Sequence, residues 1–131
     1  MMNIESLALR FLELSTTDLI AASDLLHDEI VIEFPFGPSA GFPAKVTSKA
    51  TVIEGFETFL ASVPALRFLD IVTYQTNDPD EIFLTYRANA PVPATGKRYE
   101  QSYVGYIRRK NDRIALFREY FDPMKLVEAF N

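Results

Sequence analysis

One carboxylate set between phenylalanines is the feature of this sequence best suited to chemistry. Residues 113–123 read Arg-Ile-Ala-Leu-Phe-Arg-Glu-Tyr-Phe-Asp-Pro, which predicts a strand that stops at a helix start. Because side chains alternate between the two faces of a strand, Glu119 shares its face with Phe117 and Phe121. A carboxylate among aromatic rings is costly to ionise without a cation nearby. We therefore expect its pKa to be raised, as suits a general acid or base near neutral pH.

The sequence alone leaves two interpretations of Glu119 open. It is a proton-transfer group, or it is one half of an ion pair with an arginine on a neighbouring strand, such as Arg87. A proton-transfer site also needs a hydrogen-bond donor for the substrate. Tyr86, Tyr103 and Tyr106 are the candidate phenols, and alternation places Tyr103 and Tyr106 on opposite faces, so at most one face can serve.

The composition argues against several other kinds of chemistry. The chain of 131 residues has a net charge of −5 and no stripe of lysine and arginine, so a nucleic acid is not expected as a partner. It has no cysteine, which excludes disulfides and thiol catalysis, and its single histidine, His27, argues against a histidine-based metal site or a Ser-His-Asp triad. We expect no metal and no cofactor.

No part of the chain is expected to enter a membrane. No apolar stretch approaches the roughly 20 residues that a spanning helix needs, and the first residues lack the basic and apolar pattern of a signal peptide. We therefore expect a soluble cytoplasmic protein in which residues 1–131 form one domain.

Three helices are predicted in the first half of the chain. Ile4, Leu7 and Phe11 recur at helical spacing and predict an amphipathic helix, and residues 19–26 predict a shorter one behind it. Residues 52–63 carry the apolar stripe of a third helix. The sequence therefore places most of the helical residues before the sheet.

Strands account for most of the remaining residues. Residues 30–36 predict a short strand that Pro35 either ends or places at an edge, and residues 37–47 predict a loop. Four further strands are predicted as a meander, over residues 66–76, 81–89, 98–109 and 113–121. Asp122 and Pro123 then open a short C-terminal helix. This order predicts an α+β fold, with helices on one face of a curved, mostly antiparallel sheet.

The order of elements and three short motifs resemble the NTF2-like superfamily. The motifs are Arg-Phe-Leu-Glu-Leu at 10–14, Ile-Glu-Phe-Pro-Phe-Gly at 32–37 and Glu-Tyr-Phe-Asp-Pro at 119–123. Within that superfamily the chain resembles the SnoaL-like and ketosteroid-isomerase-related branch, which includes phenazine-biosynthesis proteins. The resemblance covers nearly the whole chain. It implies a cone-shaped cavity between helices and sheet, and a homodimer formed through the open sheet face.

The resemblance does not extend to the catalytic residues of the ketosteroid isomerases. The catalytic Asp, the helix-borne phenol and the second acid of that family correspond here to Phe34, Phe11 and Val104, all apolar. Classical ketosteroid isomerisation is therefore not expected. Glu119 matches an acidic residue on the last strand that is implicated as acid or base in relatives acting on polyketide-like or phenazine precursors. Tyr106 shares its face with Val104, so we favour it as the phenol.

The resemblance implies two functions for such a cavity. The first is an enzyme that isomerises, cyclises or dehydrates a small apolar or aromatic molecule by proton transfer, with Glu119 as the acid or base. The second is a non-catalytic ligand-binding or dimerisation module. The phenylalanines suit an ordinary core as well as a pocket wall. The predicted pocket residues are Phe11, Phe34, Phe56, Phe59, Tyr86, Val104, Tyr106, Phe117 and Phe121.

Overall fold

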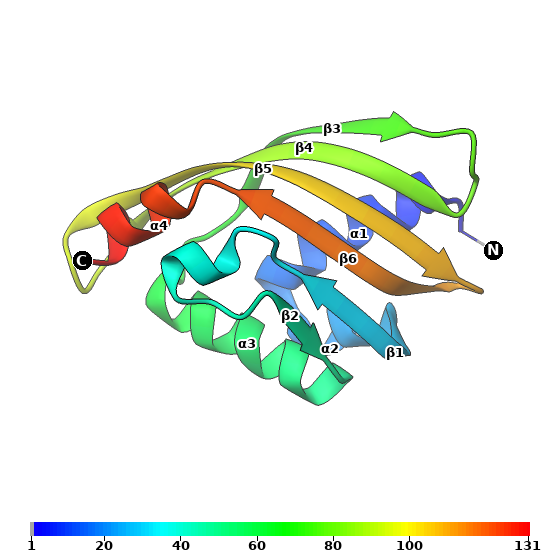
Figure 1. Cartoon of the computed structure of the whole chain (residues 1–131), viewed down its shortest axis with the longest axis horizontal. Helices are drawn as coiled ribbons and strands as arrows, with labels where there is room; N and C mark the ends of the chain where they lie inside the picture. Colours follow the sequence, from blue (N-terminus) through cyan, green and yellow to red (C-terminus); the bar gives the residue numbers. More distant parts are fainter. Residues whose placement is uncertain (1) are drawn as a thin grey trace.

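Helices and one curved sheet form two layers (Figure 1). The computed structural model describes residues 2–131. Helices α1 (Ile4–Thr17), α2 (Leu19–Asp24) and α3 (Lys49–Ser62) lie on one side of the sheet, and α4 (Pro123–Phe130) lies at its end, close to the C-terminus. A short 3-10 helix, η1 (Gly37–Ala40), lies between the first two strands. None of the helices within residues 2–131 is both long and apolar enough to cross a bilayer.

Six strands form the sheet, in the order β2-β1-β6-β5-β4-β3. The strands are β1 (Leu26–Glu33), β2 (Lys45–Thr47), β3 (Phe68–Gln75), β4 (Glu81–Val92), β5 (Lys97–Lys110) and β6 (Arg113–Phe121). β1 and β6 run parallel and all other neighbours are antiparallel. The predicted α+β class, with helices on one face of a mostly antiparallel sheet, is confirmed.

The first strand differs from its prediction at both ends. The second helix ends at Asp24, and Leu26, expected in that helix, is instead a fully buried residue of β1 paired with Ile114 of β6. β1 ends at Glu33, before Pro35, which cannot donate to a ladder. β1 is not an edge strand, because β2 forms within the predicted loop and pairs with it. Three residues are too few for an alternating pattern to reveal a strand.

Side-chain caps fix where the α-helices begin. Asn3 accepts a hydrogen bond from the Ser6 amide at 2.8 Å at the start of α1, and Asp18 accepts one from the Ala21 amide at 3.1 Å at the start of α2. Asp122 caps α4 in the same way, with Pro123 as the first helical residue, as the sequence predicted. The end of β6 and the start of α4 are therefore separated by one capping residue, which fixes where β6 stops.

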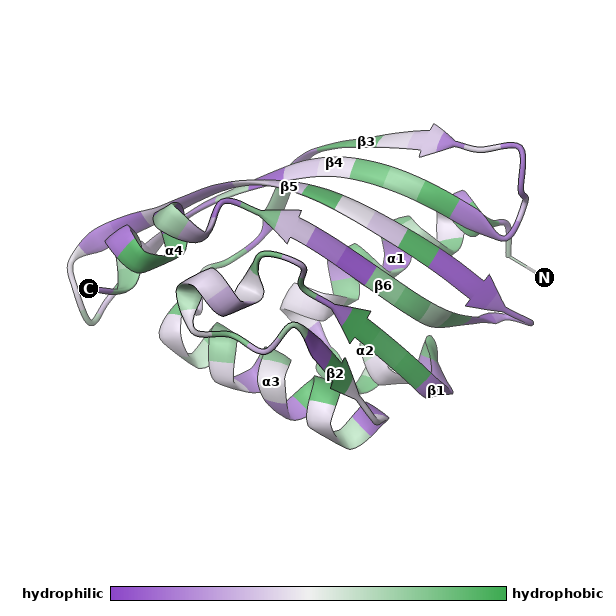
Figure 2. Ribbon diagram, viewed as in Figure 1, coloured by the Kyte–Doolittle hydropathy of each residue, from purple (hydrophilic) through white to green (hydrophobic). Residues whose placement is uncertain are grey.

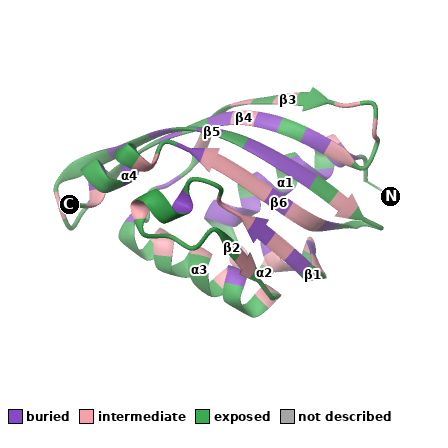
Figure 3. Cartoon of the chain, in the orientation of Figure 1, coloured by how far each residue is buried: buried purple, intermediate pink, exposed green. Residues whose placement is uncertain are grey.

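Burial differs between the helices that cover the sheet. Ile30, Val31 and Ile32 make one stretch of β1 hydrophobic, whereas the tip of β5 is hydrophilic (Figure 2). α1 packs tightly, and its Phe11 is fully buried with its ring centroid 5.4 Å from that of Phe117. α3 is mostly exposed (Figure 3), and Val52 is its one buried residue. Its apolar residues Phe56 and Phe59 are only half-buried, because both line a cavity between α3 and the sheet.

Candidate functional site

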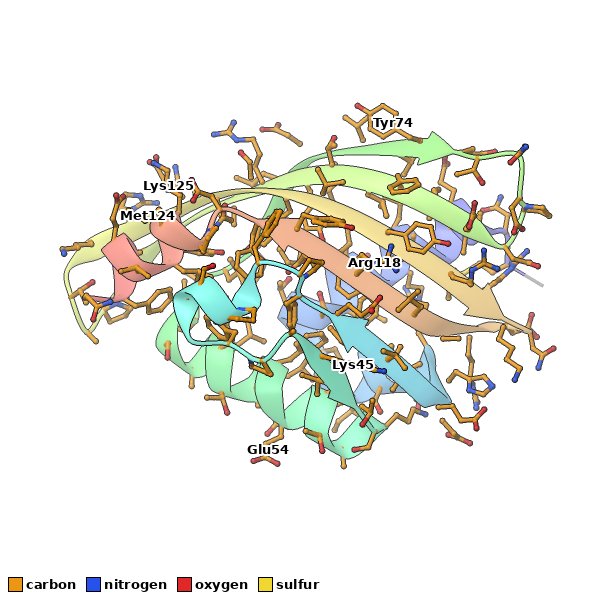
Figure 4. The ribbon with its side chains drawn as sticks, viewed as in Figure 1. Lys45, Glu54, Tyr74, Arg118, Met124 and Lys125 are labelled. Atoms are coloured by element: carbon orange, nitrogen blue, oxygen red, sulfur yellow. The ribbon has the colours of Figure 1, made fainter. Side chains whose placement is uncertain are left out.

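A cavity of about 680 Å³ lies between α3 and the sheet. Side chains from α1, α3, α4, from all strands except β4 and from the η1 loop line it, and most of them are apolar. This volume is within the range of sites that enclose a small organic molecule. None of the lining residues that the structure describes is a lysine, an arginine or a histidine. Glu54, at the mouth on α3, points away from the sheet (Figure 4).

Glu119 is the acidic group on the inner wall of the cavity. It lies on β6 and shares the cavity face with Phe117 and Phe121, as the alternation predicted. The Tyr86 hydroxyl donates to Oε2 of Glu119 at 2.5 Å. Within residues 2–131 the Glu119 carboxyl has no other hydrogen-bond or ion-pair partner. None of the described side-chain oxygens is both fully buried and without a hydrogen-bond partner, so Oε1 is accessible. We conclude that Oε1 is open to the cavity, which explains why Glu119 is half-buried although it faces inward.

The environment of Glu119 sets its acidity. Burial raises the pKa of Glu119 to about 7, against the lowering effect of the Tyr86 hydrogen bond. The predicted alternative, an ion pair with Arg87, is wrong, because Arg87 pairs with Asp70 at 3.2 Å. Arg87 follows Tyr86 on β4, so alternation turns it to the outer face of the sheet. A carboxyl with a pKa near 7 can both take and give a proton at neutral pH.

Two tyrosines of β5 supply a second polar feature of the cavity. The hydroxyls of Tyr99 and Tyr103 are 2.5 Å apart, and both residues line the cavity. Burial raises the pKa of both phenols, so they stay protonated. One hydrogen is enough to join two hydroxyls, so the accepting phenol keeps a hydrogen that it can donate elsewhere. The Tyr103 ring also stacks on that of Tyr86, with centroids 5.0 Å apart and planes at 16°.

Seven of the nine predicted pocket residues lie at the cavity or directly behind its wall. Those that line it are Phe34, Phe56, Phe59, Phe117 and Phe121. Phe11 lies behind the wall, packed against Phe117 and Phe56. Tyr86 is 1% exposed and reaches the site only through its hydroxyl.

The prediction is wrong for Val104 and Tyr106, which lie on the outer face of the sheet. Val104 is 41% exposed, and the Tyr106 hydroxyl donates to Glu81. The cause is a β-bulge in the hairpin of β5 and β6. At the turn Lys110 pairs with Arg113, and this register, if continued, would place Val104 opposite Glu119.

The bulge moves a different residue opposite Glu119. Arg109 pairs with Ile114 and Arg108 with Leu116, so Ala115 is an extra residue on β6. The register shifts by one, Gly105 lies opposite Glu119, and the residues of β5 that precede Arg109 in the chain change face. The inner face of β5 therefore carries Tyr99, Gln101, Tyr103 and Gly105. Their alternation with outward residues is visible in the sequence, but it does not tell which set faces inward.

Residues 8–117 match the model of the SnoaL-like domain, so the chain belongs to this family. It is 28% identical over 106 residues to an uncharacterized PhzA/B-like protein of Pseudomonas aeruginosa, covering 81% of this chain and 74% of that protein. Among solved structures, the "Putative Isomerase" of Bacillus subtilis has a TM-score of 0.86 at 25% identity, covering 95% of this chain and 90% of that one.

A second solved structure supports the same fold. The "putative polyketide cyclase" of Pseudomonas putida has a TM-score of 0.85 at 16% identity and covers both chains completely, at 100% each. At this identity the likeness shows the fold and not the activity. The predicted resemblance to the NTF2-like superfamily and its SnoaL-like branch is confirmed.

Proposed function

We propose that this protein binds a small, uncharged, apolar or aromatic molecule in the cavity and moves a proton on it with Glu119. The proposal is carried by the placement of Glu119: burial raises its pKa to about 7, and its Oε1 faces an apolar cavity whose described lining residues include no lysine, arginine or histidine. The reaction is an isomerisation, a cyclisation or a dehydration, each of which requires a proton to be taken and returned. The names of the two structural neighbours, an isomerase and a polyketide cyclase, agree with this class.

Three side chains have separate roles in the proposed reaction. Ionised Glu119 takes a proton from a carbon next to a carbonyl, and the electron pair of that C–H bond moves toward the carbonyl oxygen. The free hydrogen of the Tyr99–Tyr103 pair is donated to that oxygen. Protonated Glu119 then returns the proton to another atom of the substrate, or to a hydroxyl that leaves as water. Tyr86 donates to Glu119 and keeps its charged form accessible.

A generic proton-transfer probe tests this proposal without knowledge of the natural substrate. We would use 5-nitrobenzisoxazole, a flat uncharged molecule with one acidic C–H bond. When a base takes that proton, its electron pair forms a nitrile, the N–O bond breaks and a coloured phenolate is released. We expect a rate that rises with pH through a midpoint near 7 and then levels off, because only ionised Glu119 is a base.

Two other outcomes are informative. A probe that binds, as seen by NMR, but reacts only at the rate of free hydroxide would support the non-catalytic ligand-binding module instead. A probe that neither binds nor reacts would argue against a ligand site in the cavity.

We also propose that two copies of the chain associate through the outer face of the sheet. Leu69, Val72, Tyr74, Phe83 and Val104 are 39–52% exposed there, and Tyr74 points away from the helices (Figure 4). Monomeric proteins seldom expose so many large apolar side chains together. Acidic and basic side chains lie around them as ion pairs, such as Glu81–Arg108 at 2.7 Å and Glu33–Arg118 at 3.0 Å. A second copy offers the same apolar centre and the same mixed charges, which suits a two-fold interface.

We expect sedimentation velocity to give twice the chain mass of 14.9 kDa. Val104→Glu would bury an unpaired charge in the interface and should weaken the dimer by about 100-fold or more. Met124→Glu is the matched control, because Met124 is 61% exposed on α4, away from this face. A wild-type monomer at micromolar concentration, or equal dissociation of both variants, would argue against this interface.

A further inference from the structure

Tyr86 and Glu119 meet although a strand lies between them. Tyr86 is on β4 and Glu119 on β6, with β5 in the middle. Their strands are two ladder spacings apart, roughly 9.5 Å. The phenol must therefore lie across the inner face of β5 for its hydroxyl to reach the carboxyl. On that face, Gly105 is the residue opposite Glu119, and it pairs with Leu84 of β4 on its other side.

Gly105 has no backbone reason to be a glycine. The glycines with positive φ are Gly41 and Gly96, so Gly105 has ordinary strand geometry that any residue adopts. A glycine within a strand weakens it, because it adds backbone entropy to the unfolded chain and has no side chain to pack. A glycine in such a place often marks a close approach by another group.

The group that approaches Gly105 is the Tyr86 phenol. A Cβ at Gly105 would lie 3.0 Å from Oη and 3.1 Å from Cε1 of Tyr86, and 3.3 Å from Cε1 of Phe117. The Tyr86 ring has little freedom to retreat, because Tyr103 stacks on it and the Phe68 ring meets it edge-on at 4.9 Å. A methyl group at this position would therefore displace the Tyr86 hydroxyl from the position in which it donates to Glu119.

We propose that Gly105 is a positioning residue, whose missing side chain lets the Tyr86 phenol cross β5 and donate to Glu119. The hydrogen bond exists whether or not Glu119 is catalytic, so this proposal does not depend on the proposed function. Only its consequence for turnover rests on that function. Because the Tyr86 bond lowers the pKa of Glu119, its loss should leave Glu119 protonated to a higher pH.

The test is a ¹³C NMR titration of the Glu119 carboxyl in the ligand-free protein, with the signal assigned by its absence in Glu119→Gln. The titratable neighbours are Tyr86 from β4 and Tyr99 and Tyr103 from β5, with Glu54 at the mouth on α3. The tyrosines stay neutral over the range. We expect Gly105→Ala and Tyr86→Phe to raise the midpoint by the same amount, and the double variant to raise it no further.

Ser102→Thr is the matched control, since it adds one methyl group to β5 on the outer face and should leave the midpoint unchanged. A wild-type midpoint in Gly105→Ala, beside a raised one in Tyr86→Phe, would overturn the proposal, as would additive shifts in the double variant. If Gly105→Ala does not fold, Gly105→Ala/Tyr86→Leu decides, because it lacks both Tyr86 atoms, Oη and Cε1, that the new methyl would meet. Recovery of folding supports the proposal, and failure to recover contradicts it.

Discussion

Glu119→Gln is expected to slow proton abstraction in the cavity by about 10²- to 10⁴-fold, the usual contribution of a positioned general base. Glutamine has nearly the same shape, and its amide oxygen can still accept the Tyr86 hydrogen bond that Oε2 accepts in the native protein. It cannot take a proton at neutral pH. The binding of a neutral aromatic probe should therefore change only a few-fold while its turnover is lost. The measurement is the rate of 5-nitrobenzisoxazole elimination at saturating probe and pH 8, beside its dissociation constant from NMR.

Glu100→Gln is the matched control for this loss. Glu100 is exposed on β5, on the face opposite Tyr99 and Gln101, and pairs with Asn89. The same chemical change there should leave the elimination rate unaltered. An elimination rate in Glu119→Gln within a few-fold of the wild-type rate would end the assignment of Glu119 as the base.

The same Glu119→Gln variant is expected to gain stability over the wild type as the pH rises. In the folded protein Glu119 keeps its proton up to a pKa of about 7, whereas an ordinary glutamate in the unfolded chain loses it near 4.5. The stability that the neutral carboxyl contributes is thus fully present below pH 4.5 and is lost as the pH passes through 7. The difference of about 2.5 pH units corresponds to up to about 3 kcal/mol.

Urea unfolding of both proteins at pH 4 and pH 8 measures this effect. The free energy of unfolding of Glu119→Gln minus that of the wild type should be larger at pH 8 than at pH 4 by up to about 3 kcal/mol. Other titrating groups are common to both proteins and cancel in the difference. A difference that is the same at both pH values would mean that the fold does not raise the pKa of Glu119. Raising the pH through 7 therefore removes stability from the wild-type fold that the variant does not lose, because only the wild type must ionise a buried carboxyl.

Local sequence patterns were sufficient to predict most of the fold and one wall of the site. The strict alternation from Phe117 to Phe121 gave Glu119 its face, and Asp122 with Pro123 marked where the strand stops. Both features are set by neighbouring residues, through the period of a strand and the chemistry of a helix cap. The order of helices and strands followed for the same reason.

The pairing of β5 with β6 could not be predicted in this way. One extra residue, Ala115, reverses the faces of β5, so that Tyr103 faces the cavity and Tyr106 faces out. A bulge changes the pairing of two strands while leaving the alternation within each strand almost intact. The phenol favoured from the sequence was consequently on the wrong side of the sheet.

The hydrogen bond between Tyr86 and Glu119 could not be predicted, for a related reason. Tyr86 reaches it from two strands away, over a glycine that is 19 residues further along the chain than Tyr86. Such a contact depends on the registers of two strand pairs at once. No spacing within one strand encodes it, and the ion pair predicted with Arg87 placed the partner one residue away and on the opposite face.

Proton transfer in the cavity requires Glu119 to be a carboxyl that is neutral in weak acid and ionised just above neutral pH. The most direct measurement is the titration of its side-chain carboxyl by ¹³C NMR in the wild-type, ligand-free protein. We predict a single midpoint near pH 7, in agreement with burial beside described lining residues that include no lysine, arginine or histidine. A midpoint near 4.5, that of an ordinary glutamate, would contradict the proposed role of Glu119.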